Sequence, residues 1–123
     1  MEKDKLILII DDDSRNIFAL TLTLKSKGYH SVSSQSAAEG ISLLKENKNI
    51  GLVLLDMMMP EMDGYEAMKI IHGLEQCRHI PVIAVTAQAM DGDREKCIEA
   101  GAWDYISKPV DVDKLLAVIG KVK

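Results

Sequence analysis

The stretch Gly51–Gly64, GLVLLDMMMPEMDG, is an apolar run that ends in one carboxylate, Asp56. Pro60 and the pair Asp63-Gly64 follow within a few residues, and residues of these types favour turns. A short apolar run closed by turn residues is typical of a buried strand. The pattern therefore places Asp56 at the carboxyl end of a strand, which is the edge where open α/β sheets carry their chemistry.

Four further strand-like runs alternate with helical segments along the chain. The five expected strands are Leu6–Ile10, Tyr29–Ser34, Leu52–Leu55, Pro81–Val85 and Asp104–Ser107. The first expected helix runs from a Ser14 cap to a Gly28 stop, and the second begins at a Ser36 cap and has Ala38, Ile41 and Leu44 facing inward. The other three expected helices are Tyr65–Leu74, Asp91–Ala100 and Val112–Val122. This alternation predicts a parallel α/β sheet covered on both faces by right-handed crossovers. The length of 123 residues fits one domain, 1–123.

Composition and charge narrow the possible partners. Hydrophobic residues make up 47% and the net charge is −4, so we expect a globular protein without a positive field for nucleic acid. The apolar runs are too short to cross a membrane. Cys77 and Cys97 form no CxxC pair and no signal peptide is visible, so reduced thiols and a cytoplasmic location are expected.

Polar residues suited to phosphoryl chemistry follow four of the predicted strands. In chain order they are Asp11, Asp12, Asp56, Thr86 and Lys108. Parallel strands end at a shared edge, so these side chains are expected to gather there. Crowded carboxylates repel unless a cation lies among them, and hard oxygen ligands suit Mg²⁺. A carboxylate beside Mg²⁺, an ammonium and a hydroxyl can attack phosphorus, so we predict an aspartyl phosphate.

With these residues the chain resembles the receiver domains of two-component response regulators, from about Leu6 to Val122. The matching marks, in order, are Asp11-Asp12, Asp56 followed by Met59-Pro60, Asp63-Gly64, Thr86-Ala87, and Tyr105 with Lys108-Pro109. The resemblance implies a flavodoxin-like (βα)5 three-layer sandwich with strand order 2-1-3-4-5. It also implies a phosphorelay receiver that takes its phosphoryl group from a histidine kinase or a histidine phosphotransfer protein, and acts as a signalling phosphoacceptor that catalyses only its own phosphorylation and dephosphorylation.

The resemblance also assigns roles to single residues. Asp56 is the expected phosphoacceptor, with Asp12 and Asp56 binding Mg²⁺ directly, Asp11 acting mostly through water, and the Met58 carbonyl as a further ligand. Thr86 and Lys108 are expected to bind the phosphoryl oxygens, with a cis Lys108-Pro109 bond. Thr86 and Tyr105 form the expected switch pair, in which the Thr86 hydroxyl moves toward the phosphoryl group and the Tyr105 ring turns into the vacated space.

Several other residues have competing interpretations. Met58 and Gln88, each two residues past a site residue, are the positions that tune phosphate lifetime in this family, and an apolar Met58 predicts slow loss. Asp13 is better explained as a helix cap than as a ligand. Trp103 is either a partner anchor beside the switch surface or a core residue. The two cysteines, the three histidines and Met57, Met59 and Met62 fit packing or surface positions better than chemistry.

Two alternative functions use part of the same pattern. A haloacid dehalogenase-like phosphatase also begins with a strand and Asp-x-Asp, which Asp11-x-Asp13 satisfies, but Arg15 stands where that motif has Thr or Val. Asp56 would then have no role. The other alternative is a receiver-like scaffold that binds partners without phosphorylation. The stretch DREKCIEAGAWDYISKPVD is similar to receivers of hybrid histidine kinases, so either a single-domain regulator or a receiver excised from a larger protein is expected.

Overall fold

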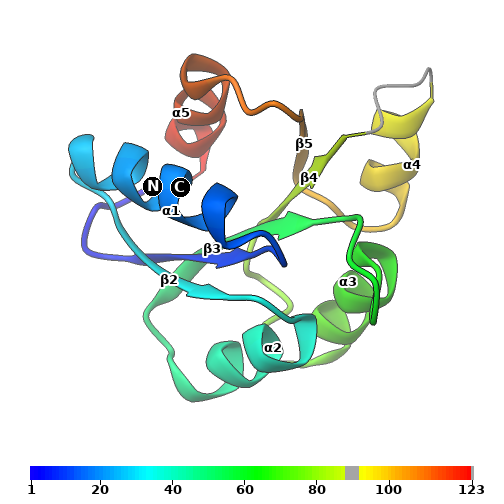
Figure 1. Ribbon diagram of the computed structural model, residues 1–123. Helices are drawn as coiled ribbons and strands as arrows, with labels where there is room; N and C mark the ends of the chain where they lie inside the picture. The colour runs from blue at the N-terminus through cyan, green and yellow to red at the C-terminus, as the bar shows by residue number, and fades with distance from the viewer. Residues whose placement is uncertain (88–91, 123) are drawn as a thin grey trace.

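The computed structural model describes residues 1–87 and 92–122 as alternating strands and helices (Figure 1). The strands are β1 (Leu6–Ile10), β2 (His30–Ser34), β3 (Ile50–Asp56), β4 (Val82–Thr86) and β5 (Asp104–Ser107). The helices are α1 (Ser14–Ser26), α2 (Ala37–Glu46), α3 (Gly64–Gly73), α4 (Asp93–Glu99) and α5 (Val112–Lys121). The predicted alternation is confirmed, and the ends of the elements shift by only a few residues.

All strand pairs are parallel, and the order across the sheet is β2-β1-β3-β4-β5. This confirms the flavodoxin-like fold. Helices α1 and α5 cover one face of the sheet, while α2, α3 and α4 lie on the other (Figure 1). The chain ends lie close together, since the Met1 ammonium donates to the Ile119 carbonyl at 3.3 Å. No helix within residues 1–87 and 92–122 is long and apolar enough to span a bilayer.

Successive residues of the central strands pack into two different cores. In β1, Ile7 and Ile9 face the α1 and α5 side, whereas Leu8 and Ile10 face the α2 and α3 side, and all four are buried. Strands β3 and β4 alternate in the same way. A strand covered on both faces must be apolar at every position, which is why these segments read as continuous apolar runs.

The helix starts confirm some predicted caps and correct others. The Asp13 carboxylate accepts the backbone N–H of Arg15 at the start of α1, so the interpretation of Asp13 as a helix cap is confirmed, and Ser14 is the first helical residue instead of the cap. An aspartate there is favoured because it satisfies an unpaired N–H of the first turn. The predicted Ser36 cap of α2 is confirmed, and so are Ile41 and Leu44 on its inward face, but Ala38 is exposed and Ala37 is buried instead.

Gly64 lets α3 begin directly against the loop that follows β3. Its N–H donates to the Met57 carbonyl at 3.2 Å, and a Cβ at Gly64 would lie 2.7 Å from the Met57 Cα. Backbone atoms cannot move aside as a side chain can. The close approach therefore holds the segment beside Asp56 in place.

Gly64→Ala should accordingly destabilise the fold by about 1–3 kcal/mol, the usual cost of forcing an extra carbon into a packed site. Gly120→Ala is the matched control, because a Cβ on that helical glycine meets nothing within 4 Å. It should instead stabilise by about 0.5–1 kcal/mol through helix propensity. Urea unfolding measures both, and equal effects of the two substitutions would contradict the packing account.

Candidate functional site

The predicted site residues arrive at one edge of the sheet because the strands that precede them are parallel. Ile10 pairs with Leu55, so Asp11, which follows β1, and Asp56, the last residue of β3, lie at the ends of adjacent strands. Thr86 is the last residue of β4, and the Lys108 N–H donates to its carbonyl at 2.7 Å. The site therefore lies at the switch point between β1 and β3, because the helices that follow these two strands lie on opposite faces of the sheet. Doubly wound folds bind ligands at such a point.

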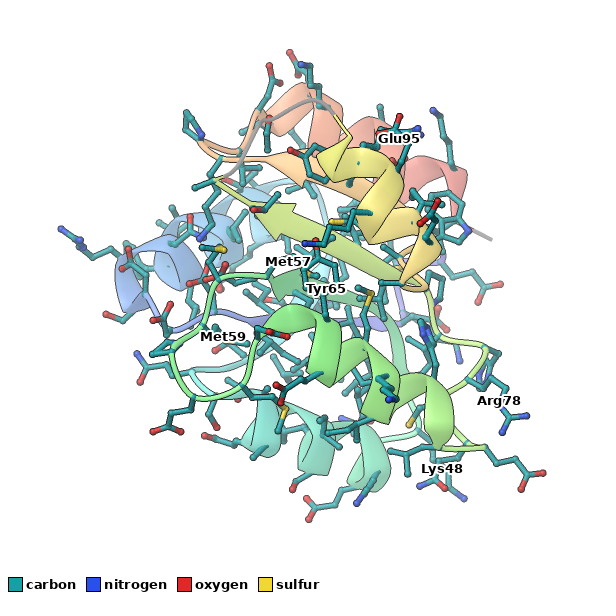
Figure 2. The ribbon with its side chains drawn as sticks, turned by 90° about the vertical axis from the view of Figure 1, so that its right-hand side faces the viewer. Lys48, Met57, Met59, Tyr65, Arg78 and Glu95 are labelled. Atoms are coloured by element: carbon teal, nitrogen blue, oxygen red, sulfur yellow. The ribbon has the colours of Figure 1, made fainter. Side chains whose placement is uncertain are left out.

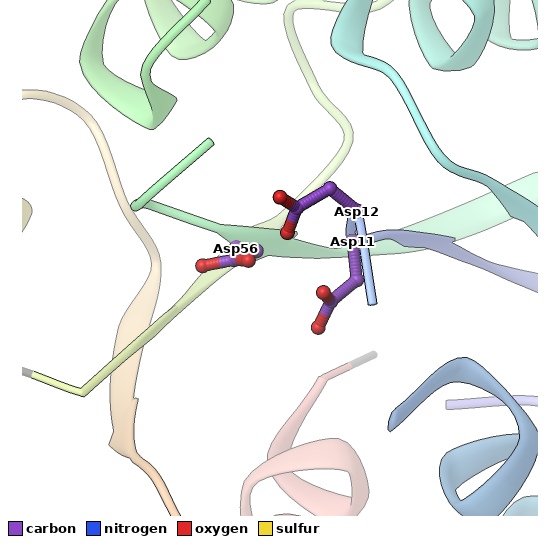
Figure 3. Close-up of side chains that lie close together, drawn as sticks. All are labelled: Asp11, Asp12 and Asp56. Carbon is purple, nitrogen blue, oxygen red and sulfur yellow. The ribbon is translucent and has the colours of Figure 1, made fainter. Parts of the chain in front are cut away.

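Three carboxylates converge at this edge (Figure 3). Asp11, Asp12 and Asp56 each offer an oxygen, and these oxygens lie within 4.8 Å of one another. Asp11 and Asp56 are buried, at 2% and 3% exposure, while Asp12 is exposed. The group is thus shielded from bulk water on the protein side and open on the other.

The Asp11 carboxylate is held by the start of α1. It accepts the Asp13 backbone N–H at 2.9 Å and a hydrogen bond from the Asn16 side-chain amide. Asn16 was missed by sequence reasoning, although its place in the first turn of the helix that starts at this edge was a usable signal. These two donors orient Asp11 toward Asp56.

Lys108 supplies the cation of the site. Its ammonium lies 3.4 Å from an oxygen of Asp11 and 3.4 Å from an oxygen of Asp56. Burial acts to lower the pKa of Lys108, but the charges of the two carboxylates outweigh it and the pKa is raised. The predicted cis Lys108-Pro109 bond is present. Lys108 is therefore charged and bridges both buried acids.

The Asp56 carboxyl has two differently occupied oxygens. One accepts the Met58 backbone N–H at 3.0 Å, and the other faces Lys108. Burial raises the pKa of Asp56 above its ordinary value; the Met58 N–H and Lys108 oppose this, and the charge of Asp11 adds to it. The ionised form of Asp56 is therefore costly unless more positive charge is brought into the site.

The proposed switch residues lie on adjacent strands. Thr86 is buried at the end of β4, and Tyr105 is partly buried in β5, opposite Ala84 in the register. The Tyr105 ring packs against the core on the α2 and α3 side. Of the two positions predicted to tune phosphate lifetime, Met58 is 53% exposed, and Gln88 lies outside the described residues.

The charge balance of the site fits a divalent cation. Three carboxylates face one ammonium, which leaves two negative charges uncompensated at a partly buried position. Oxygen ligands of this kind, with one side open for water and substrate, match what Mg²⁺ requires. Asp13, by contrast, is used as a cap, and Met57 and Met59 are buried in the core beside the site.

Fold and site together define a class of protein, and comparison with known proteins agrees. The family described as response regulator receiver domain matches residues 7–120. The chain belongs to this family, whose members carry phosphorylation-based signals in two-component systems.

Individual relatives show the same likeness along the whole chain. The polar-differentiation response regulator DivK of Brucella ovis is 36% identical over 115 residues, which cover 94% of this chain and 93% of that protein. The receiver domain of a sensor histidine kinase from Pseudomonas aeruginosa, determined with magnesium coordinated in its active-site cleft, is 30% identical with a TM-score of 0.86 and 96% coverage of both chains. The receiver domain of Ssk1 from Saccharomyces cerevisiae, determined with the histidine phosphotransfer protein Ypd1, shares the fold at 23% identity, with a TM-score of 0.89 and coverage of 99% and 90%.

Proposed function

We propose that this chain forms one receiver domain that accepts a phosphoryl group from a phosphohistidine onto Asp56. The observation that carries the proposal is the Lys108 ammonium, 3.4 Å from both Asp11 and Asp56, beside three carboxylates that share one edge. A purely structural carboxylate cluster gains nothing from such crowding. A nucleophile that must meet a phosphoryl group needs both the cation and the open side.

The transfer is a displacement at phosphorus. An oxygen of Asp56 forms the new O–P bond while the P–N bond to the donor imidazole breaks, and the imidazole leaves with that electron pair. Lys108 and the Thr86 hydroxyl bind the peripheral phosphoryl oxygens, where the charge of the transition state is spread. The Met58 N–H fixes the orientation of the carboxylate that attacks.

Asp12 and Asp56 would hold Mg²⁺ directly, with Asp11 acting mostly through water and the Met58 carbonyl as a further ligand. Bound there, the ion supplies positive charge to the carboxylates and to the phosphoryl oxygens. Asn16 and the Asp13 N–H have the supporting part, because they orient Asp11.

Incubation with acetyl phosphate and Mg²⁺, followed by intact-mass measurement, tests the proposal. We expect a stable adduct of one phosphoryl group that EDTA prevents from forming. Release of inorganic phosphate without an adduct would instead indicate an aspartate-nucleophile phosphatase. No reaction at all would indicate a binding scaffold and would overturn the proposal.

The donor surface is proposed to include α1, which starts at the acceptor edge. Leu20 and Leu24 pack inward, while Phe18 and Leu22, one turn apart, are 66% and 51% exposed. An exposed apolar pair beside a phosphoacceptor suits the helical surface of a histidine kinase or a histidine phosphotransfer protein. The complex of Ypd1 with the receiver domain of Ssk1 shows that a domain of this fold can bind a histidine phosphotransfer protein.

Thr86→Ala should separate phosphorylation from switching. The variant keeps Asp56 and Lys108, so it should still take up phosphate, but it lacks the hydroxyl that is proposed to follow the phosphoryl group. The ¹H–¹³C signals of the Tyr105 ring should therefore shift much less on phosphorylation than in the wild type. Thr86→Ser, which keeps the hydroxyl, is the control, and an unchanged Tyr105 response in Thr86→Ala would contradict the switch.

Met58→Asn should shorten the lifetime of the phosphorylated form severalfold. Met58 is exposed above Asp56 and offers a thioether, whereas an amide there can orient an attacking water. The decay of the adduct is followed by intact mass after removal of acetyl phosphate. Met58→Leu keeps the apolar character and should decay as slowly as the wild type. An asparagine variant that decays no faster would refute the lifetime role.

A further inference from the structure

A pocket that is separate from the carboxylate site lies at the other edge of the sheet, where the strands β4 and β5 begin. It has a volume of about 690 Å³, within the usual range for small-molecule sites. Its walls come from the end of α3, the loop before β4, the loop before β5 and the end of α5. The function proposed above makes no use of this pocket, and Figure 2 shows Arg78, one of its residues, on the opposite side of the view from Met59.

The rim of this pocket is positive although the protein as a whole is acidic. Arg78, Lys121, His72 and His79 line it, and none of its lining residues is an aspartate or a glutamate. Among the described residues, no carboxylate forms an ion pair with Arg78 or Lys121. In a chain with a net charge of −4, four potential donors without an acid among them create a local attraction for anions.

The floor and one wall are apolar and aromatic. Ile80, Val82, Ala102 and Val122 are buried beneath the rim, and Trp103 is 43% exposed at its side. The backbone N–H of Trp103 donates to the Val82 carbonyl at 2.7 Å, which fixes the backbone directly before β5. A half-exposed indole on a fixed backbone offers a flat surface on which a planar ring can stack.

We infer that this pocket binds a nucleoside phosphate, with the base against Trp103 and the phosphate on Arg78 and Lys121. A guanidinium and an ammonium are the side chains that best recognise phosphate oxygens. A buried apolar floor and an indole suit a planar heterocycle, and inorganic phosphate would use only the rim. The inference does not rest on the function proposed for Asp56, because the two sites lie at opposite edges of the sheet.

The competing account is that these cations only compensate helix ends. His72 and Lys121 lie in the last turns of α3 and α5, where positive charge is favoured, and Arg78 Nε donates to the His72 carbonyl at 3.4 Å. Compensation of helix ends needs neither an exposed indole nor an apolar floor. The two accounts therefore differ in whether a planar anion is bound more tightly than phosphate alone.

Trp103 provides the readout, since it is the one tryptophan of the sequence and gives a single indole N–H signal in a ¹H–¹⁵N spectrum. Titration with adenosine monophosphate should shift that signal to saturation. Adenosine alone and inorganic phosphate alone should bind at least about tenfold more weakly, because each lacks one half of the recognition. Binding should weaken as salt is raised.

Arg78→Gln and Lys121→Gln should each raise the Kd for adenosine monophosphate at least about tenfold. Lys25→Gln, which removes a lysine from the last turn of α1, is the matched control and should leave the Kd unchanged. All three variants should still be phosphorylated at the acceptor edge, which separates this test from that of the Asp56 assignment. The inference is overturned if adenosine monophosphate gives no saturable shift, if inorganic phosphate binds as tightly, or if both pocket variants bind as the wild type does.

Discussion

Asp56→Asn should abolish the incorporation of phosphate from acetyl phosphate in the presence of Mg²⁺. The amide has the shape of the carboxylate and keeps the Met58 N–H as a neighbour, but its oxygen is not a nucleophile toward phosphorus. Intact mass of the treated variant should show no phosphoryl adduct. Full labelling of Asp56→Asn would show that another residue is the acceptor.

Loss of labelling in this variant should not reflect unfolding. Burial raises the pKa of Asp56, so its ionised form costs stability, and that cost grows as the pH rises past the ordinary carboxyl range. A neutral asparagine removes this cost, so at neutral pH without Mg²⁺ the variant should unfold at a higher temperature than the wild type. Asp4→Asn makes the same charge change before β1, at the opposite edge, and should label normally.

Lys108→Met should slow phosphorylation by about 10²–10³-fold, the usual effect of removing one preorganised charge from a transition state. Methionine retains much of the length of lysine without its charge. The rate of adduct formation at limiting acetyl phosphate measures the effect. Lys69→Met removes an exposed lysine of α3 and should leave the rate unchanged.

The same substitution should destabilise the metal-free protein at neutral pH by about 1.5–3 kcal/mol, since Asp11 and Asp56 lose their shared charged donor. The sign of this change in stability can be checked by measuring its pH dependence. The raised pKa of Lys108 means that its contribution is fully present at neutral pH and is lost only at alkaline pH. As the pH falls and the carboxylates take up protons, the deficit of Lys108→Met should shrink. A deficit that is the same at acid and neutral pH would mean that the effect is packing and not charge.

Much of this molecule follows from local sequence patterns. Strands β1, β3 and β4 could be predicted because strands buried on both faces leave continuous apolar runs, and the polar residue at the end of each run then marks the carboxyl edge. The edge strands β2 and β5 are only partly buried and left weaker signals, a faint alternation in β2 and a short run before Lys108-Pro109 in β5. Once the strands are taken as parallel, the convergence of Asp11, Asp56 and Lys108 is a geometric consequence. The strand order itself came from the resemblance to receivers, because periodicity does not show which strands pair.

The errors have equally local causes. Asp13 and Ser14 were both expected to cap α1 because both residue types favour that position, and only the backbone shows that Asp13 is the cap. On the inward face of α2, Ile41 and Leu44 were predicted correctly and only Ala38 was wrong, because alanines at 37 and 38 look alike in a hydrophobic pattern. Asn16 lies only five residues from the Asp11 carboxylate to which it donates, so its place in the first turn of α1 could have indicated it. The basic pocket around Trp103 depends on contacts between segments far apart in sequence, which no local pattern reveals.

Chemical trapping of the acceptor tests the central claim most directly. Borohydride reduces an aspartyl phosphate to homoserine, so peptide mass spectrometry of the reduced protein locates the residue that carried the phosphoryl group. After treatment with acetyl phosphate and Mg²⁺, homoserine should appear at position 56 and should disappear when EDTA is present from the start. Homoserine at position 11 or 12, or a phosphoryl adduct that borohydride does not convert, would contradict the assignment of Asp56.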